Sequence, residues 1–464
     1  MGMLVDYLVA KLIWNSHSCI TEGGTTITYA EFLDKAECLA SKLSDKHVYG
    51  VLCAQELNTA IGIFACLLSG ATAVPLSYRY GQAHADSIIE CSNLQCLITD
   101  DGGNADVMLL CPRPCAKRKA LADIALIPYS SDLSDNLKGV MLTEESLYYN
   151  LVDIENQFYM EEEDSILIIR PLYHCSVFTG EFLAAMSAGA HIHFYSKPFF
   201  PQVIAKEVFD KSITVLGATP SVHGQLCDFF AKFSRKVPLK KVVSSGESMT
   251  KAVADKMLRL LPATKIYSSY GLTEASPRVA LLNPDLFEKH YKSVGAPLAH
   301  VEVMVTDEIG NALPANADGE LLVRGEGMMS GFYLNAQETE HAAANSWYHT
   351  GKIGCLDKKG LLYVKKRSEN MIVRAGRRIL PHELESVLTS HAKVADAAVY
   401  EASDKRSLRK ITADVVSEPS VSKKDILNLC REGLPSYAVP DVVNFVDYIP
   451  RNGAGKVIQR CGDS

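Results

Sequence analysis

The fold assignment of this chain depends most on the stretch Tyr270-Gly271-Leu272-Thr273-Glu274. It follows a strand-like run at residues 264–267. Its side chains offer an aromatic ring, which can stack on a flat ligand, and a carboxylate, which is a hard oxygen ligand for a cation. Five residues of this kind can also form an ordinary turn, so the surrounding sequence must decide between the two interpretations.

Around this stretch, short apolar runs rich in Val, Ile and Leu alternate with helical patterns. The strand-like runs lie at residues 49–52, 72–74, 166–169, 191–194, 214–218 and 242–245. The helical patterns lie at residues 29–43, 57–69, 180–188 and 250–260. This alternation predicts an α/β architecture of layered subdomains with largely parallel sheets.

The pattern changes twice towards the C-terminus. From residue 293 to residue 364, short strands are separated by Gly, Asn and Asp turns, which predicts a β-rich subdomain. After residue 365 the alternation of strands and helices restarts and is long enough for a small α+β domain. We therefore expect a large N-terminal domain at residues 1–365 and a small, mobile C-terminal domain at residues 366–464.

The composition of the 464 residues excludes several classes of protein. The net charge of −7 argues against a general nucleic-acid binder. The 13 cysteines are scattered and lack zinc-site spacing, which favours reduced thiols in the cytoplasm. Residues 1–14 read as an amphipathic helix rather than a signal peptide. The longest apolar run, residues 61–76, is interrupted and too short to span a bilayer. We expect a cytoplasmic protein without a membrane span.

Several stretches besides Tyr270–Glu274 occur in a fixed order along the chain. They are Gly319-Glu320-Leu321, Gly331-Phe332-Tyr333, Tyr348-His349-Thr350-Gly351, Arg367-Ser368-Glu369 and Pro450-Arg451-Asn452-Gly453-Ala454-Gly455-Lys456. In order and spacing they resemble the motifs of the adenylate-forming (AMP-binding) superfamily, which includes acyl- and aryl-CoA ligases, peptide-synthetase adenylation domains and luciferases. The resemblance extends from residues 25–29 to Lys456.

The resemblance implies that the chain binds ATP with Mg²⁺. Its nucleotide contacts would be Ser131, Lys138, Gly246, Glu247, Tyr270, Thr273 and Arg367. Glu274 would hold the metal ion. Tyr270 would stack on adenine, Arg367 would contact ribose and Lys138 would steady the phosphates.

The resemblance also implies which residues serve the acyl group. Lys456 corresponds to the family's catalytic lysine, a compact positive charge that a glycine turn delivers to developing negative charge. Glu369 corresponds to the acid at the hinge between the domains. Gly376 corresponds to the glycine beside the pantetheine arm of CoA or of a carrier protein. His174 corresponds to a histidine that lines the acyl pocket or gates thiol entry, although a lone histidine is often structural.

A thiol–imidazole pair between His174 and Cys175 is not expected. We place these adjacent residues on a strand, where neighbouring side chains point to opposite faces.

The chain departs from the family's pattern at the phosphate loop. In the segment from Pro128 to Gly139, Tyr129, Ser131, Lys138 and Gly139 fit the pattern, whereas the loop glycines and threonines are replaced by Asp132, Leu133, Ser134 and Asp135. Glycine lets backbone amides approach phosphate closely. The negative charge of each aspartate, at ~4 Å from a phosphate, would weaken phosphate binding by roughly 4 kcal/mol at a dielectric constant of about 20. In addition, Lys352 replaces an aspartate that accepts the ribose hydroxyls, and a lysine can only donate.

Three functions are compatible with this sequence. The first is an adenylate-forming ligase that activates a carboxylic acid as acyl-AMP and transfers the acyl group to CoA, a carrier-protein pantetheine or an amine. The second is an ATP-independent acyltransferase or condensing enzyme that acts on an acyl thioester, motivated by Asp132, Asp135 and Lys352. The third is a non-catalytic relative that binds an acyl ligand or a partner such as an acyl carrier protein.

Overall fold

The computed structural model comprises several sheets in two compact units. It describes residues 2–44, 47–77, 82–94, 96–100, 108–110, 121, 123–129, 137–197, 199–233, 235–307, 309–342, 347–365, 372–374, 377–379, 381–403, 409–434 and 438–450. One unit contains Met1–Thr350 and Gly354–Val364, and the other contains Gly351–Ile353 and Lys365–Ser464. None of the described helices is both long enough and apolar enough to cross a membrane.

A nine-stranded sheet forms the centre of the first unit. Its strands run in the order β15-β14-β13-β12-β11-β9-β10-β1-β2. The six strands from β13 to β1 are parallel, while β14, β15 and β2 are antiparallel additions at the two ends. The bounds are β1 Cys19–Glu22, β2 Thr25–Thr28, β9 Ser165–Ile168, β10 His191–Phe194, β11 Val215–Ala218, β12 Lys241–Ser245, β13 Lys265–Gly271, β14 Arg278–Leu282 and β15 Ala296–Pro297.

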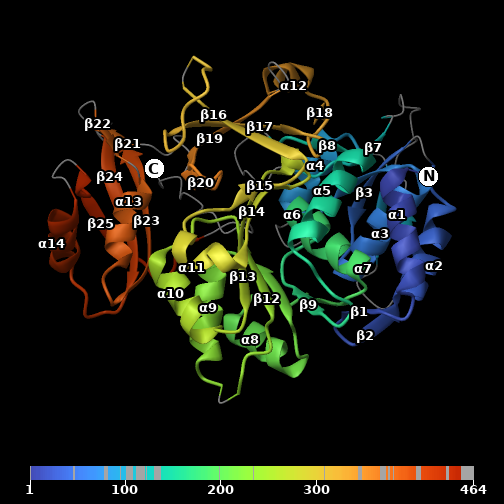
Figure 1. Cartoon of the computed structure of the whole chain (residues 1–464), viewed down its shortest axis with the longest axis horizontal. Helices are drawn as coiled ribbons and strands as arrows, with labels where there is room; N and C mark the ends of the chain where they lie inside the picture. The colour runs from blue at the N-terminus through green and yellow to red at the C-terminus, as the bar shows by residue number, and fades with distance from the viewer. Residues whose placement is uncertain are drawn as a thin grey trace. The chain divides into compact units, whose positions relative to one another are not determined.

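Helices cover both this sheet and the next one. In Figure 1, α8, α9 and α10 lie side by side against β12 and β13, and α1, α2 and α3 gather near the N-terminus. The bounds are α1 Met3–Trp14, α2 Tyr29–Ala40, α3 Glu56–Ser69, α4 Gln82–Cys91, α5 Glu144–Gln157, α6 Cys175–Val177, α7 Ala184–Ala188, α8 Pro201–Asp210, α9 Pro220–Phe230, α10 Lys251–Leu260 and α11 Phe287–His290. Short 3-10 turns are η3 Thr273–Ala275 and η4 Pro284–Leu286.

Two helices differ from the pattern that the sequence predicts. The helix expected at residues 29–43 ends at Ala40, and a turn follows. The helix expected at residues 180–188 begins as a π-helical turn, η2 Phe178–Leu183, before α7. Apolar spacing indicates a helical face but does not distinguish one helical hydrogen-bond pattern from another.

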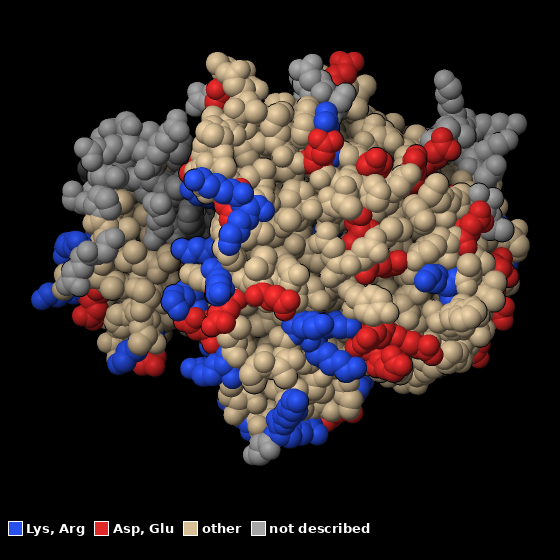
Figure 2. Space-filling view, viewed as in Figure 1, with Lys and Arg blue, Asp and Glu red and all other residues tan. Residues whose placement is uncertain are grey.

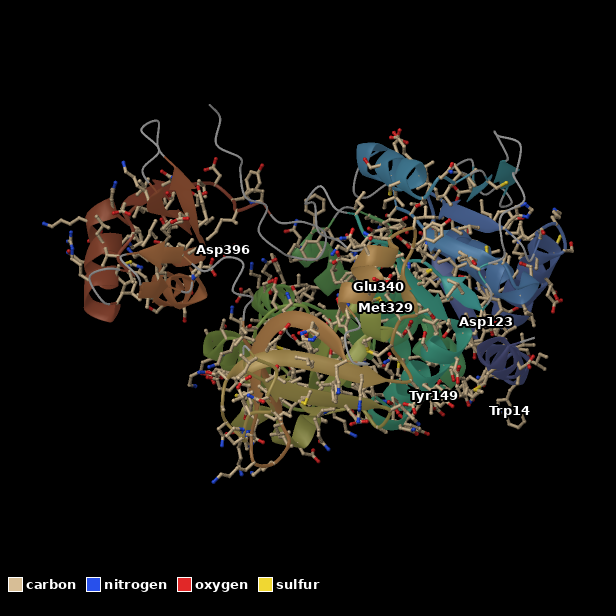
Figure 3. All side chains as sticks on the ribbon, turned by 90° about the horizontal axis from the view of Figure 1, so that it is seen from above. Trp14, Asp123, Tyr149, Met329, Glu340 and Asp396 are labelled. Atoms are coloured by element: carbon tan, nitrogen blue, oxygen red, sulfur yellow. The ribbon has the colours of Figure 1, made fainter. Side chains whose placement is uncertain are left out.

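The helix starts are explained by local chemistry. Thr28 and Thr143 form capping boxes at α2 and α5, because each threonine side chain accepts from a backbone N–H one turn later. At the other end of α1, Trp14 projects into solvent with 82% of its surface exposed (Figure 3). The remaining face of α1 is buried through Leu4, Leu8 and Leu12. The amphipathic helix expected at the N-terminus is therefore present.

A seven-stranded sheet and a four-stranded sheet complete the first unit. The seven-stranded order is β18-β8-β7-β4-β3-β5-β6, and the four-stranded order is β16-β17-β19-β20. The four-stranded sheet lies where the sequence predicts a β-rich subdomain. The bounds are β3 Val48–Leu52, β4 Thr72–Pro75, β5 Cys96–Thr99, β6 Met108–Leu110, β7 Ile124–Leu126, β8 Val140–Thr143, β16 Val301–Thr306, β17 Gly319–Gly325, β18 Gly331–Phe332, α12 Ala336–Ala342, β19 Tyr348–Leu356 and β20 Leu362–Lys365.

The second unit has its own apolar core. Strands β23, β24 and β25 form a three-stranded sheet, and β21 and β22 form an antiparallel pair. Helices α13 and α14 pack with the sheet around buried Leu384, Ile411 and Ile426. The bounds are β21 Ile372–Arg374, β22 Arg377–Ile379, α13 Pro381–Thr389, β23 Val394–Ser403, β24 Arg409–Ser417, α14 Lys423–Gly433 and β25 Val442–Phe445.

Gly295 should be indispensable to the close approach of the backbone before β15 to β14. Its φ is +94°, and a methyl group there would overlap the backbone of Leu281. We expect Gly295→Ala to lower the free energy of unfolding by about 3 kcal/mol or more, from strain and overpacking together.

Gly310 provides the matched control. Its φ of +88° is similar, but none of the described residues comes within 4 Å of the position that a methyl group would take there. Gly310→Ala should therefore cost only the backbone strain, about 1 kcal/mol. Urea unfolding monitored by circular dichroism measures both, and equal losses would contradict the packing explanation.

Candidate active site

One edge of the nine-stranded sheet gathers most of the predicted site residues. Parallel strands β9, β11, β12 and β13 all end at this edge, and antiparallel β14 begins there because Gly271 pairs with Arg278. Ligands of open α/β sheets bind outside the carboxyl ends of the strands. The connections that leave this edge carry His174, Gly246, Glu247, Thr273 and Glu274.

The stretch from Tyr270 to Glu274 spans the end of β13 and the turn η3. Tyr270 is half-buried and packs against the main apolar core. The backbone carbonyl of Glu274 accepts from the N–H of Met329 at 2.9 Å, which fixes the turn (Met329 is labelled in Figure 3). The Glu274 carboxylate is half-buried and makes no hydrogen bond or ion pair with any other described residue. A fixed backbone therefore presents an unengaged carboxylate at the sheet edge.

Gly246 and Glu247 follow β12. Gly246 has a φ of +89°, a conformation that glycine adopts without strain. The Glu247 carboxylate accepts from the backbone N–H of Ser221 at 3.1 Å and from its hydroxyl at 3.0 Å. Glu247 is therefore engaged at the N-terminus of α9, where a carboxylate also interacts favourably with the helix dipole.

The two ends of the predicted phosphate loop lie together. Tyr129 and Gly139 form an antiparallel bridge, and the carbonyl of Tyr129 accepts from the hydroxyl of Tyr173 at 3.2 Å. Lys138 forms an ion pair with Glu338 of α12 and lies 5.4 Å from the centroid of the Phe332 ring. Ser131, like Asp132 and Asp135, lies outside the described residues.

His174 and Cys175 do not lie on a strand, as the sequence analysis expects, but at the start of α6. Pro171 follows the end of β9 and removes a donor that a strand would need. Burial, and then the charge of Arg170, lowers the pKa of His174 to about 3. Burial raises the pKa of Cys175 to about 12. At neutral pH the pair is an uncharged imidazole and a thiol, which excludes a thiolate–imidazolium nucleophile.

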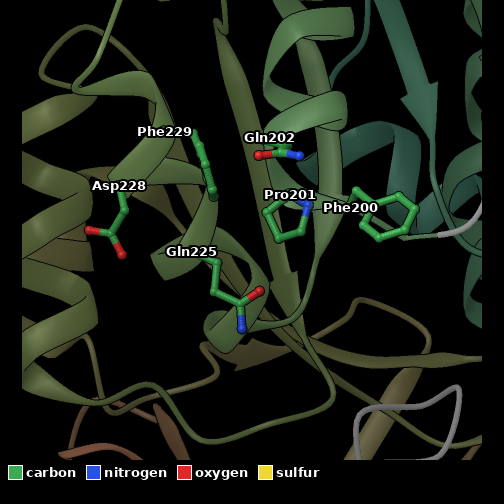
Figure 4. A pocket seen from close by; sticks show the side chains of 6 residues that line it. All are labelled: Phe200, Pro201, Gln202, Gln225, Asp228 and Phe229. Carbon is green, nitrogen blue, oxygen red and sulfur yellow. The ribbon is translucent and has the colours of Figure 1, made fainter. Parts of the chain in front are cut away.

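A surface pocket in the α8–α9 region is separate from these motifs. Its lining residues are Phe200, Pro201, Gln202, Gln225, Asp228 and Phe229 (Figure 4). None of them belongs to a predicted motif. On the face seen in Figure 2, basic and acidic side chains occur beside one another rather than in a continuous basic surface. This distribution agrees with the acidic net charge.

Family models match two consecutive parts of the chain. The model for AMP-binding enzyme matches residues 13–333, which is more than half of the chain. The chain belongs to the AMP-binding enzyme family. The model for the AMP-binding enzyme C-terminal domain matches residues 383–456. The adenylate-forming resemblance in the sequence is thereby confirmed.

The curated relatives of this AMP-binding enzyme include acid–CoA ligases. The chain is similar to 2-succinylbenzoate–CoA ligase from Bacillus licheniformis, with 26% identity over 95% of both chains. It is also similar to feruloyl-CoA synthase from Amycolatopsis sp, with 25% identity over 95% of this chain and 94% of that protein.

Solved structures share the fold of this AMP-binding enzyme. O-succinylbenzoate coenzyme A synthetase (MenE) from Bacillus subtilis, in complex with AMP, matches with a TM-score of 0.83 and 23% identity over 99% of this chain and 98% of that chain. Amide bond synthetase McbA from Marinactinospora thermotolerans matches with a TM-score of 0.80 and 22% identity over 98% of both chains. The predicted fold class, with its large N-terminal and small C-terminal domains, is confirmed.

Several predicted residues of this AMP-binding enzyme cannot be placed. Arg367, Glu369, Gly376 and Lys456 lie outside the described residues. Lys352 lies in β19. The roles assigned to all of these residues stay predictions.

The sequence analysis missed a group of buried charges at the same sheet edge. Arg170 follows β9, Glu181 lies in the π-helical turn η2, and Arg278 begins β14. Arg170 Nη2 donates to Glu181 Oε1 at 2.5 Å. Each charge interrupts an otherwise apolar run, and this interruption is the signal that could have revealed the group.

Three buried histidines of this AMP-binding enzyme should make its stability sensitive to acid. Burial lowers the pKa of His174 and His193 to about 3 and that of His223 to about 4, from an ordinary value of 6.5. The unfolded chain therefore binds protons near pH 6.5 that the folded chain does not bind. The free energy of unfolding should have its full value above that pH. It should fall as the pH drops, by up to ~1.4 kcal/mol per histidine at one pH unit below 6.5.

The measurement is the midpoint of thermal unfolding at pH 7, 6 and 5. His223→Gln should flatten the decline relative to the wild type. His17→Gln, at a largely exposed side chain, should leave the decline unchanged. If His223→Gln and His17→Gln have the same slope as the wild type, the buried histidine is not the source.

Proposed function

We propose that this AMP-binding enzyme is an AMP-forming acid–thiol ligase. It joins a carboxylic acid to AMP with release of pyrophosphate, and then passes the acyl group from the mixed anhydride to the thiol of CoA. The observation that carries this proposal is that both family domains occur in order in one chain, which aligns with named CoA ligases over 95% of both lengths.

The sheet edge fits a nucleotide with Mg²⁺. Glu274 presents a carboxylate without a hydrogen-bond or ion-pair partner among the described residues, and Mg²⁺ is usually held by one or two carboxylates together with substrate phosphates. Thr273 lies beside it, and Tyr270 is positioned at the end of β13 to cover a purine. Mg²⁺ would supply positive charge that offsets the charge of the phosphates.

The remaining assignments follow from the family motifs. Ser131 and Lys138 bind phosphate oxygens, Gly246 and Glu247 border the adenine, and Arg367 contacts ribose. Because Glu247 is already engaged with Ser221, its contribution is to hold the end of β12 against α9 rather than to bind the base directly.

The C-terminal residues complete the reaction. Lys456 neutralises the charge that develops between the carboxylate and the α-phosphate. Domain 366–464 turns about Glu369 and brings Gly376 beside the pantetheine arm of CoA. His174 remains neutral and lines the entry to the acyl group, where an uncharged ring does not protonate the attacking thiolate.

The ATP-independent acyltransferase is not favoured. The replaced loop residues were the reason to consider it. However, the Glu274 carboxylate, which has no hydrogen-bond or ion-pair partner among the described residues, would have no function in a reaction without a metal–nucleotide complex. An amine is a second acceptor, because an amide bond synthetase shares the fold. We place the reaction in the cytoplasm, since the cysteines that the structure describes are free thiols.

The first experiment is ATP–pyrophosphate exchange across a panel of carboxylic acids, followed by CoA-dependent AMP release with the active acids. We expect exchange without CoA, and thioester only with ATP, acid and CoA together. Lys456→Ala should reduce exchange by at least about 100-fold, the scale of removing one group that stabilises transition-state charge.

Two results would count against the proposal. A folded protein that shows no exchange with any acid overturns the ligase. Turnover of an acyl thioester with an amine or carbon nucleophile in the absence of ATP would instead establish the acyltransferase. Unfolding midpoints confirm that Lys456→Ala remains folded.

The ion pair between Lys138 and Glu338 should limit affinity for ATP. Both side chains are about one-third exposed, so the pair holds the lysine without burying it. Phosphate binding must compete with the Glu338 carboxylate for Lys138. We expect Glu338→Gln to lower the KM for ATP by about 2- to 5-fold, consistent with up to ~1 kcal/mol for such a pair.

Glu340→Gln is the matched control, because Glu340 lies on the same helix with its side chain exposed. It should leave the KM for ATP unchanged. A Glu338→Gln variant with a raised KM would show that the carboxylate positions Lys138 for phosphate rather than withholding it.

A further inference from the structure

Two arginines and one glutamate are buried together at the carboxyl edge of the nine-stranded sheet. Glu181 is 2% exposed and Arg278 is 4% exposed. The Arg170 side chain is 17% exposed and donates to Glu181 Oε1. The charge of Glu181 raises the pKa of Arg278 and that of Arg170 lowers it, so all three groups act on one another electrostatically.

Two glycines provide the room for these charges. A Cβ at Gly180 of η2 would lie 2.8 Å from Arg278 Nη2. A Cβ at Gly217 of β11 would overlap the Glu181 carboxylate. The backbone of the helix turn and of the strand therefore leaves space that the charged side chains enter. A π-helical turn, as at η2, frequently marks a functional site.

The hydrogen bonding of this group is incomplete. Arg170 Nε, Arg278 Nη1 and Glu181 Oε2 are buried and have no hydrogen-bond partner among the described residues. Buried polar atoms are nearly always satisfied, so unsatisfied ones require a functional or structural reason. Two buried N–H donors that belong to different arginines point to an acceptor that the protein itself does not supply.

The charge of the group is also unbalanced. Within this group of described residues, two guanidinium groups accompany one carboxylate, which leaves one positive charge without an ion-pair partner in the group. Burial lowers the pKa of Arg278 to about 10, so it stays charged at neutral pH. Two titratable neighbours, His174 and His223, add no charge of either sign, because burial and the charge of Arg170 lower their pKa values and keep them neutral. An uncompensated buried charge is costly unless a counter-ion completes it.

We propose that Arg170 and Arg278 bind a second carboxylate on the acid substrate, so that the enzyme activates dicarboxylic acids in preference to monocarboxylic acids. The inference rests on the proposed ligase function. One substrate carboxylate reacts at the nucleotide side, and the other occupies the arginine pair and neutralises it. Glu181 orients Arg170 through their ion pair.

The chemistry of the group favours an anion over other ligands. A substrate ammonium group could form an ion pair only with Glu181, and Arg170 already neutralises the charge of Glu181. An apolar acyl end would leave the N–H donors of two arginines without acceptors. A guanidinium donates in a planar pattern that matches a carboxylate, and paired arginines suit both of its oxygens.

Matched acid pairs test the proposal. ATP–pyrophosphate exchange is measured with glutarate and pentanoate, adipate and hexanoate, and benzene-1,4-dicarboxylate and 4-methylbenzoate. We expect at least one dicarboxylate to exceed its monocarboxylate partner in kcat/KM by about 100-fold or more, because the partner leaves buried donors unpaired. Calorimetric binding of the same acids gives a readout that does not depend on turnover.

Variants identify the responsible side chain. Arg278→Met leaves the neutral Arg170–Glu181 pair and should abolish the dicarboxylate preference, measured as the ratio of kcat/KM between the two members of each acid pair. The double variant Arg170→Met with Glu181→Met removes one charge of each sign and keeps Arg278, and its preference should lie between those of the wild type and Arg278→Met because one of the two arginine donors remains. Arg324→Met is the control, because Arg324 forms an exposed ion pair with Glu302 in β16 and β17.

The outcomes separate the two proposals. Exchange with monocarboxylates at or above the dicarboxylate rate overturns the substrate preference and leaves the ligase intact. If none of the acids supports exchange, the ligase proposal is overturned, and calorimetry still decides whether dicarboxylates bind. If Arg278→Met fails to fold, equal binding of both members of every acid pair to the wild type overturns the inference by itself.

Discussion

The parallel alignment of β9, β11, β12 and β13 is the constraint on which the rest of the site depends. Each parallel strand contributes its last residue and the connection that follows to the carboxyl edge of the sheet. Four strands with a common direction therefore bring four connections to one edge. Antiparallel β14 adds its first residue to the same edge, since Arg278 pairs with Gly271. Residues more than a hundred positions apart in sequence thus meet, and no local interaction is needed to gather them.

The phosphate loop shows how far a motif can change while its ends are retained. Tyr129 and Gly139 keep the bridge that closes the base of the loop, and Lys138 keeps its place after the loop. The acidic replacements fall between these ends. In the proposed function, the two added aspartates make the balance of charge around the phosphates depend more strongly on the metal ion and on basic side chains than a glycine-rich loop does.

Sequence reasoning predicted the elements best where burial is continuous. The run at residues 214–218 contains β11, because a strand buried on both faces reads as an unbroken apolar segment. It failed at His174, which we expected on a strand, because Pro171 ends the regular backbone there. The π-helical turn η2 could not be predicted from the sequence, since its hydrogen-bond pattern leaves no distinct spacing of apolar residues.

The site was predictable in its motifs but not in its buried charges. Tyr270, Thr273 and Glu274 form a contiguous stretch that can be compared with a known pattern. Arg170, Glu181 and Arg278 come from three separate elements, so each appears in the sequence as a single charge with no indication of its partners. Their association exists only through the tertiary structure, as does the engagement of Glu247 with Ser221.

The close approach of Glu181 to Gly217 links two positions that are 36 residues apart on different elements. A side chain at position 217 is excluded while the carboxylate is present, and loss of the carboxylate leaves a void that a larger residue there would fill. A larger residue at position 217 is therefore accommodated only after the carboxylate has been lost, which fixes the order of the two changes on the route to an uncharged acyl chamber. Divergence to apolar substrates therefore has to proceed through coordinated replacement in the strand, the helical turn and the arginine pair.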